Sequence, residues 1–267
     1  MAIRVRPVVP TLDFPRIAEL ITQVESDPVT AEALHEREQR RPHGYVGIHL
    51  VAADDEERVA GYAKAEHLPW MRPGFFWSWV VVDEQRQREG IGSLLAGQII
   101  EFAASQGATR LESELRDNCA RCLRFAERHG FTPYTRHFES MLDLTSFDER
   151  RFGGAVKAVE AMGIRFFTLA DVPQTTESER AYYELWSDAA RDVPGVEAFG
   201  NPPFEQFRES LFGAAEFRPD CHIVAADGED WVGFTAMEYS AESNSAYNRM
   251  TGVRRSHRGR QLALALK

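Results

Sequence analysis

Apolar residues recur with two different periods along the first half of the chain. Three stretches rich in aromatic and β-branched side chains predict strands, the first two of them joined as a hairpin by an acidic turn: 45–53, 59–68 and 75–82. Apolar residues three and four positions apart predict helices at 13–24, 30–39, 93–106 and 120–129. Shorter strands are expected at 3–5, 111–115 and 138–144. Because hairpins and helices are interleaved, the expected fold class is α/β, of the α+β type, in which one sheet contains both parallel and antiparallel strands.

The ends of these helices carry local signals. Asp13 is suited to cap the first helix, with Pro15 in its first turn. Gly107 and Gly130 follow the apolar runs of the last two helices, and glycine is the residue that most often ends a helix. These residues predict where three of the helices begin or end.

The second half of the chain repeats the first. The run His49–Asp54, HLVAAD, returns as His222–Asp227, HIVAAD. In the same order, VAGYA at 59–63 matches WVGFT at 231–235. Further matches are Glu66 with Glu238, Val82 with Val253 and Gln87 with Arg258. Matches that keep their order along the chain indicate duplication of one domain.

Duplication predicts two tandem domains of one fold. The first spans 1–145, a charged linker helix spans 146–162, and the second domain spans 163–267. The second domain stops inside the counterpart of the helix after Gly92, so we expect it to be incomplete at its C-terminus. Either the sequence stops before the domain does, or another segment or a second subunit completes it. A homodimer is one of the expected arrangements.

A buried strand, a charged turn and a helix start follow one another at 80–93, VVVDEQRQREGIGS. The first N–H groups of a helix have no partner within it, and the helix dipole adds partial positive charge there. Gly90 and Gly92 let a ligand approach this backbone, and Arg86 and Arg88 supply charge. The segment predicts a pyrophosphate site, with glycines that serve only packing as the alternative. Neither the P-loop nor the dinucleotide-binding pattern fits its glycine spacing.

Two short motifs, QREGIG at 87–92 and NCARCLRFAERHGF at 118–131, carry a family resemblance. The first resembles the Gln/Arg-x-x-Gly-x-Gly/Ala acetyl-CoA motif of the GNAT (Gcn5-related N-acetyltransferase) superfamily. The second is similar to that family's other signature, in which an Asn precedes a helix ending in Phe-Tyr-Glu-x-x-Gly-Phe. The resemblance covers the whole first domain, and the repeat implies a tandem GNAT protein.

By this resemblance the first domain takes acetyl-CoA as co-substrate and needs no metal. The strand would pair with the pantetheine arm, and the loop and helix start would hold the pyrophosphate. The implied coenzyme-binding residues are Val80, Val81, Val82, Gln87, Arg88, Glu89, Gly90, Ile91, Gly92, Ser93 and Asn118. Asn118 is also placed to cap its helix, and the two roles are compatible. In the second copy Gln261 stands where the inner glycine is usual, so its side chain would meet the phosphate.

Acetyl transfer to an amine needs a base for the amine proton and a fixed donor for the charge that develops on the thioester oxygen. Glu66, at the end of a predicted strand, is the expected base, with a solvent-facing residue as the alternative. The backbone N–H groups of 80–82 are the expected donors. Ser78, between two tryptophans, would line the acceptor site or satisfy a backbone group.

The tyrosine that the GNAT family uses as general acid is missing, because Ala126 stands at its position. Tyr134 is a nearby candidate for protonating the leaving thiolate, with a core position as its alternative. The neighbouring aromatic residues would form an apolar acceptor pocket or part of the core. They are Trp70, Phe75, Phe76, Trp77 and Trp79.

Composition narrows the function classes further. A formal net charge of −10 argues against a nucleic-acid partner. No stretch resembles a secretory signal or a membrane span, so a cytoplasmic protein with no membrane partner is expected. Three cysteines, Cys119, Cys122 and Cys221, do not suggest a disulfide framework, and one CxxC pair is a weak metal signal. We interpret Cys119 and Cys122 as incidental, with a reactive thiol at Cys119, at a helix start, as the alternative.

The function expected from these features is that of a GNAT-type acyltransferase, an N-acetyltransferase acting on an amine of a small molecule or a protein. The alternative is a non-catalytic acyl-CoA-binding or regulatory module, which Ala126 and Gln261 favour. A third interpretation is an O-acyltransferase or a different acyl group, for which a broad pocket beside Ser78 would speak. Turnover of acetyl-CoA, rather than its binding alone, separates the first two.

Overall fold

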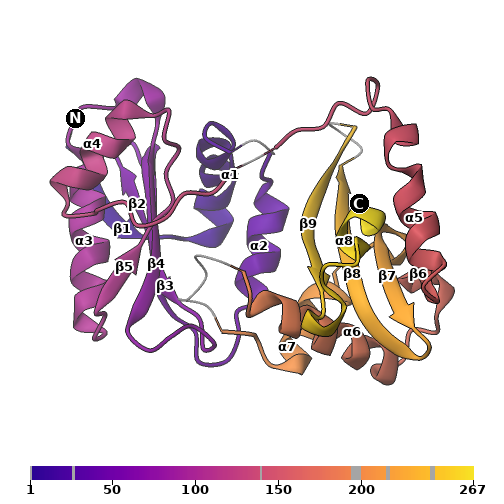
Figure 1. The fold of residues 1–267 in the computed structure, drawn as a ribbon. Coiled ribbons are helices and arrows are strands. Elements are labelled where there is room, and N and C mark those ends of the chain that lie inside the picture. The colour runs from indigo at the N-terminus through magenta and orange to yellow at the C-terminus, as the bar shows by residue number, and fades with distance from the viewer. Residues whose placement is uncertain (1, 26–27, 139, 194–199, 215–216, 241–243) are drawn as a thin grey trace. The chain divides into compact units, whose positions relative to one another are not determined.

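The computed structural model describes the chain apart from residues 1, 26–27, 139, 194–199, 215–216 and 241–243 (Figure 1). The chain divides into two compact units, Met1–Arg136 and His137–Lys267, each with its own sheet. Both sheets carry helices, so the mixed α/β fold class predicted from the sequence is confirmed.

The first unit is built on a five-stranded sheet in the order β1-β2-β3-β4-β5. Neighbouring strands are antiparallel except β4 and β5, which are parallel. The strands are β1 (Arg4–Pro7), β2 (Val46–Ala53), β3 (Val59–His67), β4 (Phe75–Val82) and β5 (Arg110–Glu112). The sheet is therefore mixed, as the interleaved hairpins and helices predict.

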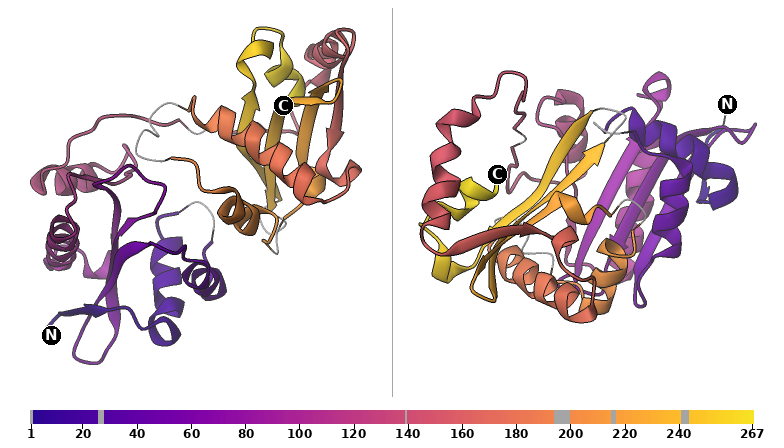
Figure 2. Two further views of the ribbon diagram at one scale, coloured as in Figure 1. Left: turned by 90° about the horizontal axis from the view of Figure 1, so that it is seen from below. Right: turned by 90° about the vertical axis from the view of Figure 1, so that its right-hand side faces the viewer.

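Helices cover both faces of this sheet, as Figures 1 and 2 show from three sides. They are α1 (Pro10–Thr22), α2 (Ala31–Gln39), α3 (Ile91–Ser105) and α4 (Ala120–Arg128), with a 3-10 turn η1 (Glu84–Arg86). Apolar residues of α1 pack on one face, against Val51, Tyr62 and Val81. Those of α3 pack on the other face, against Leu50 and Ala63. Alternate residues of each strand thus belong to an α1 face or an α3 face.

Helix α1 begins at Pro10, ahead of the expected cap. Val9 is the N-cap, and Asp13 lies inside the helix, where its carboxylate accepts a hydrogen bond from the Val9 N–H at 2.7 Å. Arg6 of β1 donates to both oxygens of the same carboxylate, at 2.7 and 2.9 Å. The expected capping role is wrong because Asp13 is engaged in a buried ion pair with the neighbouring strand.

Replacing Asp13 by Ala is expected to lower the free energy of unfolding by about 3 kcal/mol, because it leaves the guanidinium of Arg6 largely buried without its main partner. Glu57, the half-exposed second partner of Arg6, provides the control. Glu57→Ala should cost less than about 1 kcal/mol, as for other surface ion pairs. Urea unfolding of both variants checks this, and equal losses would contradict the assignment.

The second unit carries a four-stranded antiparallel sheet in the order β6-β7-β8-β9. The strands are β6 (Ile164–Thr168), β7 (His222–Asp227), β8 (Asp230–Ser240) and β9 (Ser245–Val253). The helices are α5 (Gly153–Glu160), α6 (Thr176–Ala190), α7 (Phe204–Leu211) and α8 (Leu262–Leu266). The 3-10 turns are η2 (Glu149–Arg151), η3 (Leu169–Asp171), η4 (Pro219–Cys221) and η5 (Arg255–His257). One core joins α6 and α7 to the sheet, and another joins α5 and α8.

The two sheets have the same pattern of strand pairing. The first four strands of the first unit and the four strands of the second have the same order, and all of these pairs are antiparallel. The register shifts between Ala52 and Ala53 in one sheet and between Ala225 and Ala226 in the other. These positions are equivalent in the repeated HLVAAD and HIVAAD runs, so the sequence repeat extends to the backbone.

The region between the two sheets differs from expectation. In the described part of 138–144 no strand forms, and Glu139 lies outside the described residues. The apolar residues Phe138, Met141 and Leu144 are exposed. The alternating pattern is misleading here because β5 is only three residues long and ends the sheet, which leaves little ladder to extend. The expected linker range, 146–162, contains η2 and α5.

Candidate functional site

The parallel strands β4 and β5 separate soon after they pair. Their pairing ends at Trp77 and Glu112, where β5 stops while β4 continues to Val82. At the point of separation the buried Ser78 hydroxyl donates a hydrogen bond to the Glu112 carbonyl oxygen at 3.0 Å. From Ser78 onward, no described strand pairs with β4 on its β5 side. Backbone groups on this edge can therefore pair with an extended ligand.

Helix α3 follows this strand after the turn η1 and a short loop, and its first turn is open. Its N-cap, Gly90, has a φ of +84°, in the left-handed region, and no atom lies within 4 Å of the position that a Cβ would take. Leu94 N–H bonds to the Gly90 carbonyl, so the N–H groups of 91–93 have no partner within the helix. Gly92 has a different role, because a Cβ there would meet the Phe125 ring of α4 at 3.1 Å. Gly90 keeps the helix start accessible, and Gly92 lets α4 approach.

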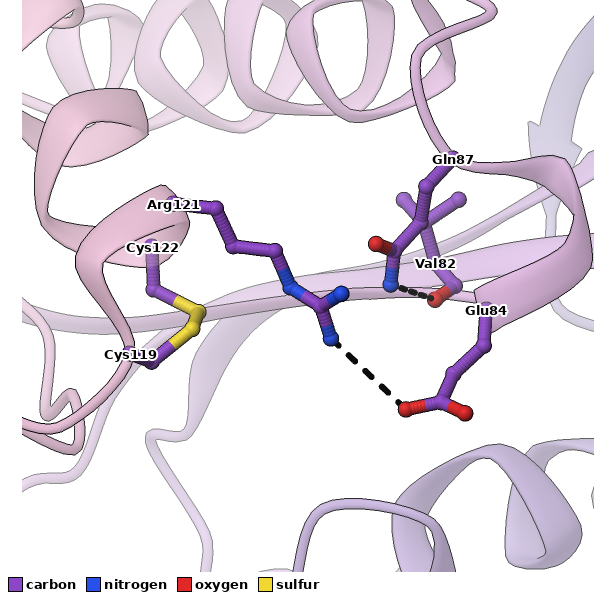
Figure 3. Close-up of a disulfide and its surroundings, with 6 residues drawn as sticks. All are labelled: Val82, Glu84, Gln87, Cys119, Arg121 and Cys122. Atoms are coloured by element: carbon purple, nitrogen blue, oxygen red, sulfur yellow. Dashed lines mark hydrogen bonds and ion pairs between the residues drawn. A yellow bond between two sulfur atoms is a disulfide. The ribbon is translucent and has the colours of Figure 1, made fainter.

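The charged loop before α3 is partly engaged by its own side chains. Arg86 donates to Glu89 at 2.8 and 2.9 Å and lies 3.6 Å from the buried carboxylate of Asp54. Gln87 donates to the Val82 carbonyl oxygen at 3.4 Å (Figure 3). Arg88 is exposed, has a φ of +71° and makes no ion pair within the described part of the chain. The loop therefore offers Arg88, and not Arg86, to an anion.

Helix α4 approaches α3 at Gly92, and Asn118 stands just before the first turn of α4. The N-cap of α4 is Cys119, so the capping role considered for Asn118 is wrong and its exposed side chain stays available to a ligand. A shallow hollow of about 430 Å³ is lined by Asn118, Cys119, Ala120 and Arg121. Arg121 lies 3.6 Å from Glu84 of the loop (Figure 3), which links α4 to the segment before α3.

Glu66 stands in a polar cluster on the α1 face of the sheet, because Tyr62 of the α1 core and Glu66 point to the same side of β3. Its Oε1 is 2.6 Å from the Lys64 ammonium, and its Oε2 accepts a hydrogen bond from the Tyr45 hydroxyl at 3.2 Å. Burial alone would raise the pKa of Glu66, but Lys64 and the Tyr45 hydroxyl hold it below its usual value. The side chain is only 17% exposed, but its lowered pKa keeps the carboxylate ionised at neutral pH.

His49 connects this cluster to the core. Its Nε2 is 2.8 Å from the Tyr45 hydroxyl, and its Nδ1 is 2.8 Å from the Tyr62 hydroxyl. Burial, helped by nearby cations, lowers the pKa of His49 to about 3, so the ring is neutral. Because Tyr45 donates its proton to Glu66, it accepts from His49, and Tyr62 donates to the other ring nitrogen. One chain of hydrogen bonds runs from Tyr62 to Glu66.

The buried, neutral His49 makes stability depend on pH. In the unfolded chain it takes up a proton near pH 6.5, whereas in the fold it stays neutral down to about pH 3. The unfolded state binds more protons in this window, so the stabilisation is complete above pH 6.5 and is lost as the pH falls towards 3, at up to about 1.4 kcal/mol per pH unit. Urea unfolding between pH 8 and 4.5 should show a shallower decline for His49→Gln than for the wild type. Equal slopes below pH 6.5 would contradict this account.

Glu112 is a buried carboxylate that the sequence analysis did not single out; it is 6% exposed. The register pairs Glu66 with Trp77 and Trp77 with Glu112, so two carboxylate residues flank one indole across three strands. The Tyr134 hydroxyl donates to Glu112 Oε2 at 3.0 Å, and Arg110 Nε lies 2.8 Å from Oε1. An acidic residue inside a short predicted strand was the available signal, but its burial depends on Tyr134 and Arg110.

The three residues expected to be catalytic occupy different surroundings. Glu66 and Tyr134 belong to the row just described, with the ring of Tyr134 against the Arg110 guanidinium, 4.3 Å from the ring centroid. Ser78 alternates with the tryptophans and shares the α3 face with Phe76, whose ring meets Phe102 of α3. Of the two roles considered for Ser78, the structure shows the backbone contact to Glu112.

The second unit lacks several of these features. Gln261 is the N-cap of α8 and holds a left-handed φ of +63° where the first unit has glycine. Arg255 and Arg258 of its loop both bond to Asp192, which lowers the pKa of that carboxyl well below its usual range. Glu238, the counterpart of Glu66, is 57% exposed. The first unit is the better candidate for a ligand site.

Among the described residues, no three His, Cys, Asp or Glu side chains are grouped so that they could hold a metal ion. No helix in the described part of the chain combines the length and the apolar character needed to cross a bilayer.

The chain is similar to known proteins in sequence and in fold. Residues 14–131 match the sequence profile of the acetyltransferase (GNAT) family. No curated protein matches the chain in sequence. Among solved structures, the GCN5-related N-acetyltransferase from Sphaerobacter thermophilus has a TM-score of 0.66 at 21% identity, over 99% of this chain and 80% of its own. A tandem GNAT protein from the clavulanic acid biosynthesis pathway has a TM-score of 0.67 at 17% identity, over 99% of this chain and 83% of its own.

The two kinds of match are complementary. The family profile covers the segment that contains β4, the open start of α3 and the α4 helix. The structural matches extend over both units and concern the fold. The first unit therefore belongs to the GNAT acetyltransferase family, and the chain as a whole has the tandem GNAT fold.

Proposed function

We propose that the first unit is an N-acetyltransferase that transfers an acetyl group from acetyl-CoA to an amine of a small molecule or a protein. The observation that carries this proposal is the continuity between the unpaired edge of β4 and the open start of α3. An extended ligand with a pyrophosphate at one end fits both features at once. Its phosphates would meet the N–H groups of 91–93 and the side chain of Arg88.

The chain's own residues fit such a coenzyme. The edge of 80–82 would pair with the pantetheine amides, Gly90 leaves the helix start open, and the exposed side chain of Asn118, just before α4, would reach the coenzyme. Gln87 and Glu89 would act indirectly, since their side chains hold Val82 and Arg86 in place. The acetyl end of the bound coenzyme would then lie near Trp77, where β4 and β5 separate.

When bound, the coenzyme supplies an acetyl thioester. Glu66, ionised and held by Lys64 and Tyr45, would accept the proton of the acceptor amine directly or through a water molecule. Backbone N–H groups along the free edge of β4 would stabilise negative charge on the carbonyl oxygen. Because Glu66 and Trp77 are cross-strand neighbours, the base would stand one strand away from the reacting end.

The leaving thiolate needs a proton donor, and Ala126 provides no hydroxyl at the position that the family uses. We propose Tyr134 for this role. Its hydroxyl already points to Glu112 in the row of Glu66 and Trp77, and its side chain is about half exposed. Glu112 and Arg110 would position the ring rather than react.

A non-catalytic acyl-CoA-binding module is the second candidate, and the ion pair between Glu66 and Lys64, together with Ala126, favours it. One experiment separates the two. Acetyl-CoA binding is measured by calorimetry, and release of the coenzyme thiol is measured with a panel of primary amines and peptides. Amine-dependent thiol release supports the enzyme, whereas binding without release from any acceptor supports the module.

A further inference from the structure

A disulfide stands at the start of α4, beside the proposed coenzyme site (Figure 3). It joins Cys119, the N-cap, to Cys122 in the first turn, with their Cα atoms 5.2 Å apart. Both residues are only partly buried, so small molecules can reach them. Cys221, in the second unit, is a free thiol.

The disulfide is physically connected to the loop before α3. Phe125, one turn further along α4, contacts the position where a Cβ of Gly92 would lie. Arg121, between the two cysteines, pairs with Glu84 of the loop, as Figure 3 shows. The hollow beside the helix start is lined by Asn118 and Cys119. A change of charge or conformation in this turn therefore acts directly on residues proposed to hold the coenzyme.

We propose that Cys119 and Cys122 form a thiol–disulfide exchange site that reacts with low-molecular-weight disulfides and sets the affinity of the first unit for acetyl-CoA. The disulfide form binds the coenzyme more tightly than the dithiol form. The coupling to the coenzyme rests on the function proposed above, whereas the exchange chemistry stands on the cysteine pair itself.

The exchange reaction needs only the two cysteines and one small disulfide. A Cys119 thiolate would be stabilised by the N–H groups of the helix start. This thiolate attacks one sulfur of a disulfide RSSR, forms a mixed disulfide and releases RS⁻. Cys122 loses its proton to solvent, attacks the sulfur of Cys119 and expels the second RS⁻. Two protein thiols are oxidised, and one small disulfide is reduced to two thiols.

The difference in affinity follows from charge and order. In the dithiol form, a Cys119 thiolate would place a negative charge at the start of α4, next to Asn118, which is proposed to bind the anionic coenzyme. In the disulfide form that charge is absent, and the bond restricts the turn that carries Asn118. One charge at a helix start corresponds to an effect of about fivefold in the dissociation constant.

The first part of the test follows the exchange alone. The full chain is reduced with a phosphine, treated with oxidised glutathione, alkylated with iodoacetamide and weighed by mass spectrometry. We expect one alkylated cysteine, Cys221, after oxidation and three before it. Cys122→Ser should stop at a glutathione adduct on Cys119, because the resolving thiol is missing. Alkylation of all three cysteines after prolonged oxidation would overturn the exchange site.

The second part measures acetyl-CoA binding by calorimetry to the reduced and oxidised full chain. We expect about fivefold tighter binding by the oxidised form, the same ratio in Cys221→Ser, and no redox dependence when Cys119 and Cys122 are both replaced by Ser. Equal affinities of the two wild-type forms, or tighter binding by the reduced one, would overturn the coupling and leave the proposed function intact. If neither form binds, both the coupling and the proposed function fail.

Discussion

Replacing Gly90 and Gly92 together by Glu is expected to weaken acetyl-CoA binding by at least about 100-fold, to the limit of calorimetric detection. Both substitutions add negative charge at a helix start proposed to hold a pyrophosphate, where the N–H groups of 91–93 have no partner within the helix. Any side chain at Gly90 projects into the space that is now free of atoms within 4 Å. Titration of acetyl-CoA into the variant and the wild type measures the loss.

The two glycines can be separated by their surroundings. Gly92 packs against Phe125, so its replacement also disturbs α4, whereas Gly90 has open space around it. Gly90→Glu alone should therefore account for most of the loss. Gly97→Glu is the matched control, because Gly97 lies exposed on the same helix, also with nothing within 4 Å of an added Cβ. Comparable weakening by Gly97→Glu would show a general effect of charge and contradict the location of the site.

Replacing Glu66 by Gln is expected to lower kcat by about 100- to 1000-fold while leaving the affinity for acetyl-CoA within about twofold of the wild type. The amide keeps the size of the side chain and can still accept a hydrogen bond from Tyr45, but it cannot take a proton from the acceptor amine. The measurement is amine-dependent release of the coenzyme thiol at saturating acetyl-CoA.

Glu238→Gln is the control for this substitution, because Glu238 occupies the equivalent position of the repeat and is exposed. It should leave kcat unchanged. A Glu66→Gln enzyme with wild-type kcat would remove Glu66 from the role of base and turn attention to Glu112, the other buried carboxylate of the same row.

Much of the fold follows from local pattern and repetition. The β2–β3 hairpin, β4 and α3 lie where the periodicity of apolar residues predicts them, because each buries one face or stripe in a core. The duplication was visible because the HLVAAD and HIVAAD runs fill equivalent buried strands with the same bulge. The loop before α3 could be recognised because its charged residues and glycines follow one another closely in the sequence.

Features that depend on distant residues could not be predicted in this way. Asp13 looked like a helix cap, but its carboxylate is bound by Arg6 of the neighbouring strand. The burial of Glu112 depends on Tyr134, which lies outside its strand, and the neutral state of His49 depends on its burial and on nearby cations. The sequence offers Arg86 and Arg88 equally to an anion, but Arg86 is held by Glu89 and Asp54.

We propose that the first unit holds acetyl-CoA between the free edge of β4 and the start of α3, and that the second unit does not. Hydrogen–deuterium exchange of the full chain, with and without acetyl-CoA, tests it most directly. We expect slower exchange in peptides covering 78–93 and 113–122, and unchanged exchange in 249–262. Unchanged exchange across 78–93 at saturating coenzyme, or protection confined to 249–262, would contradict it.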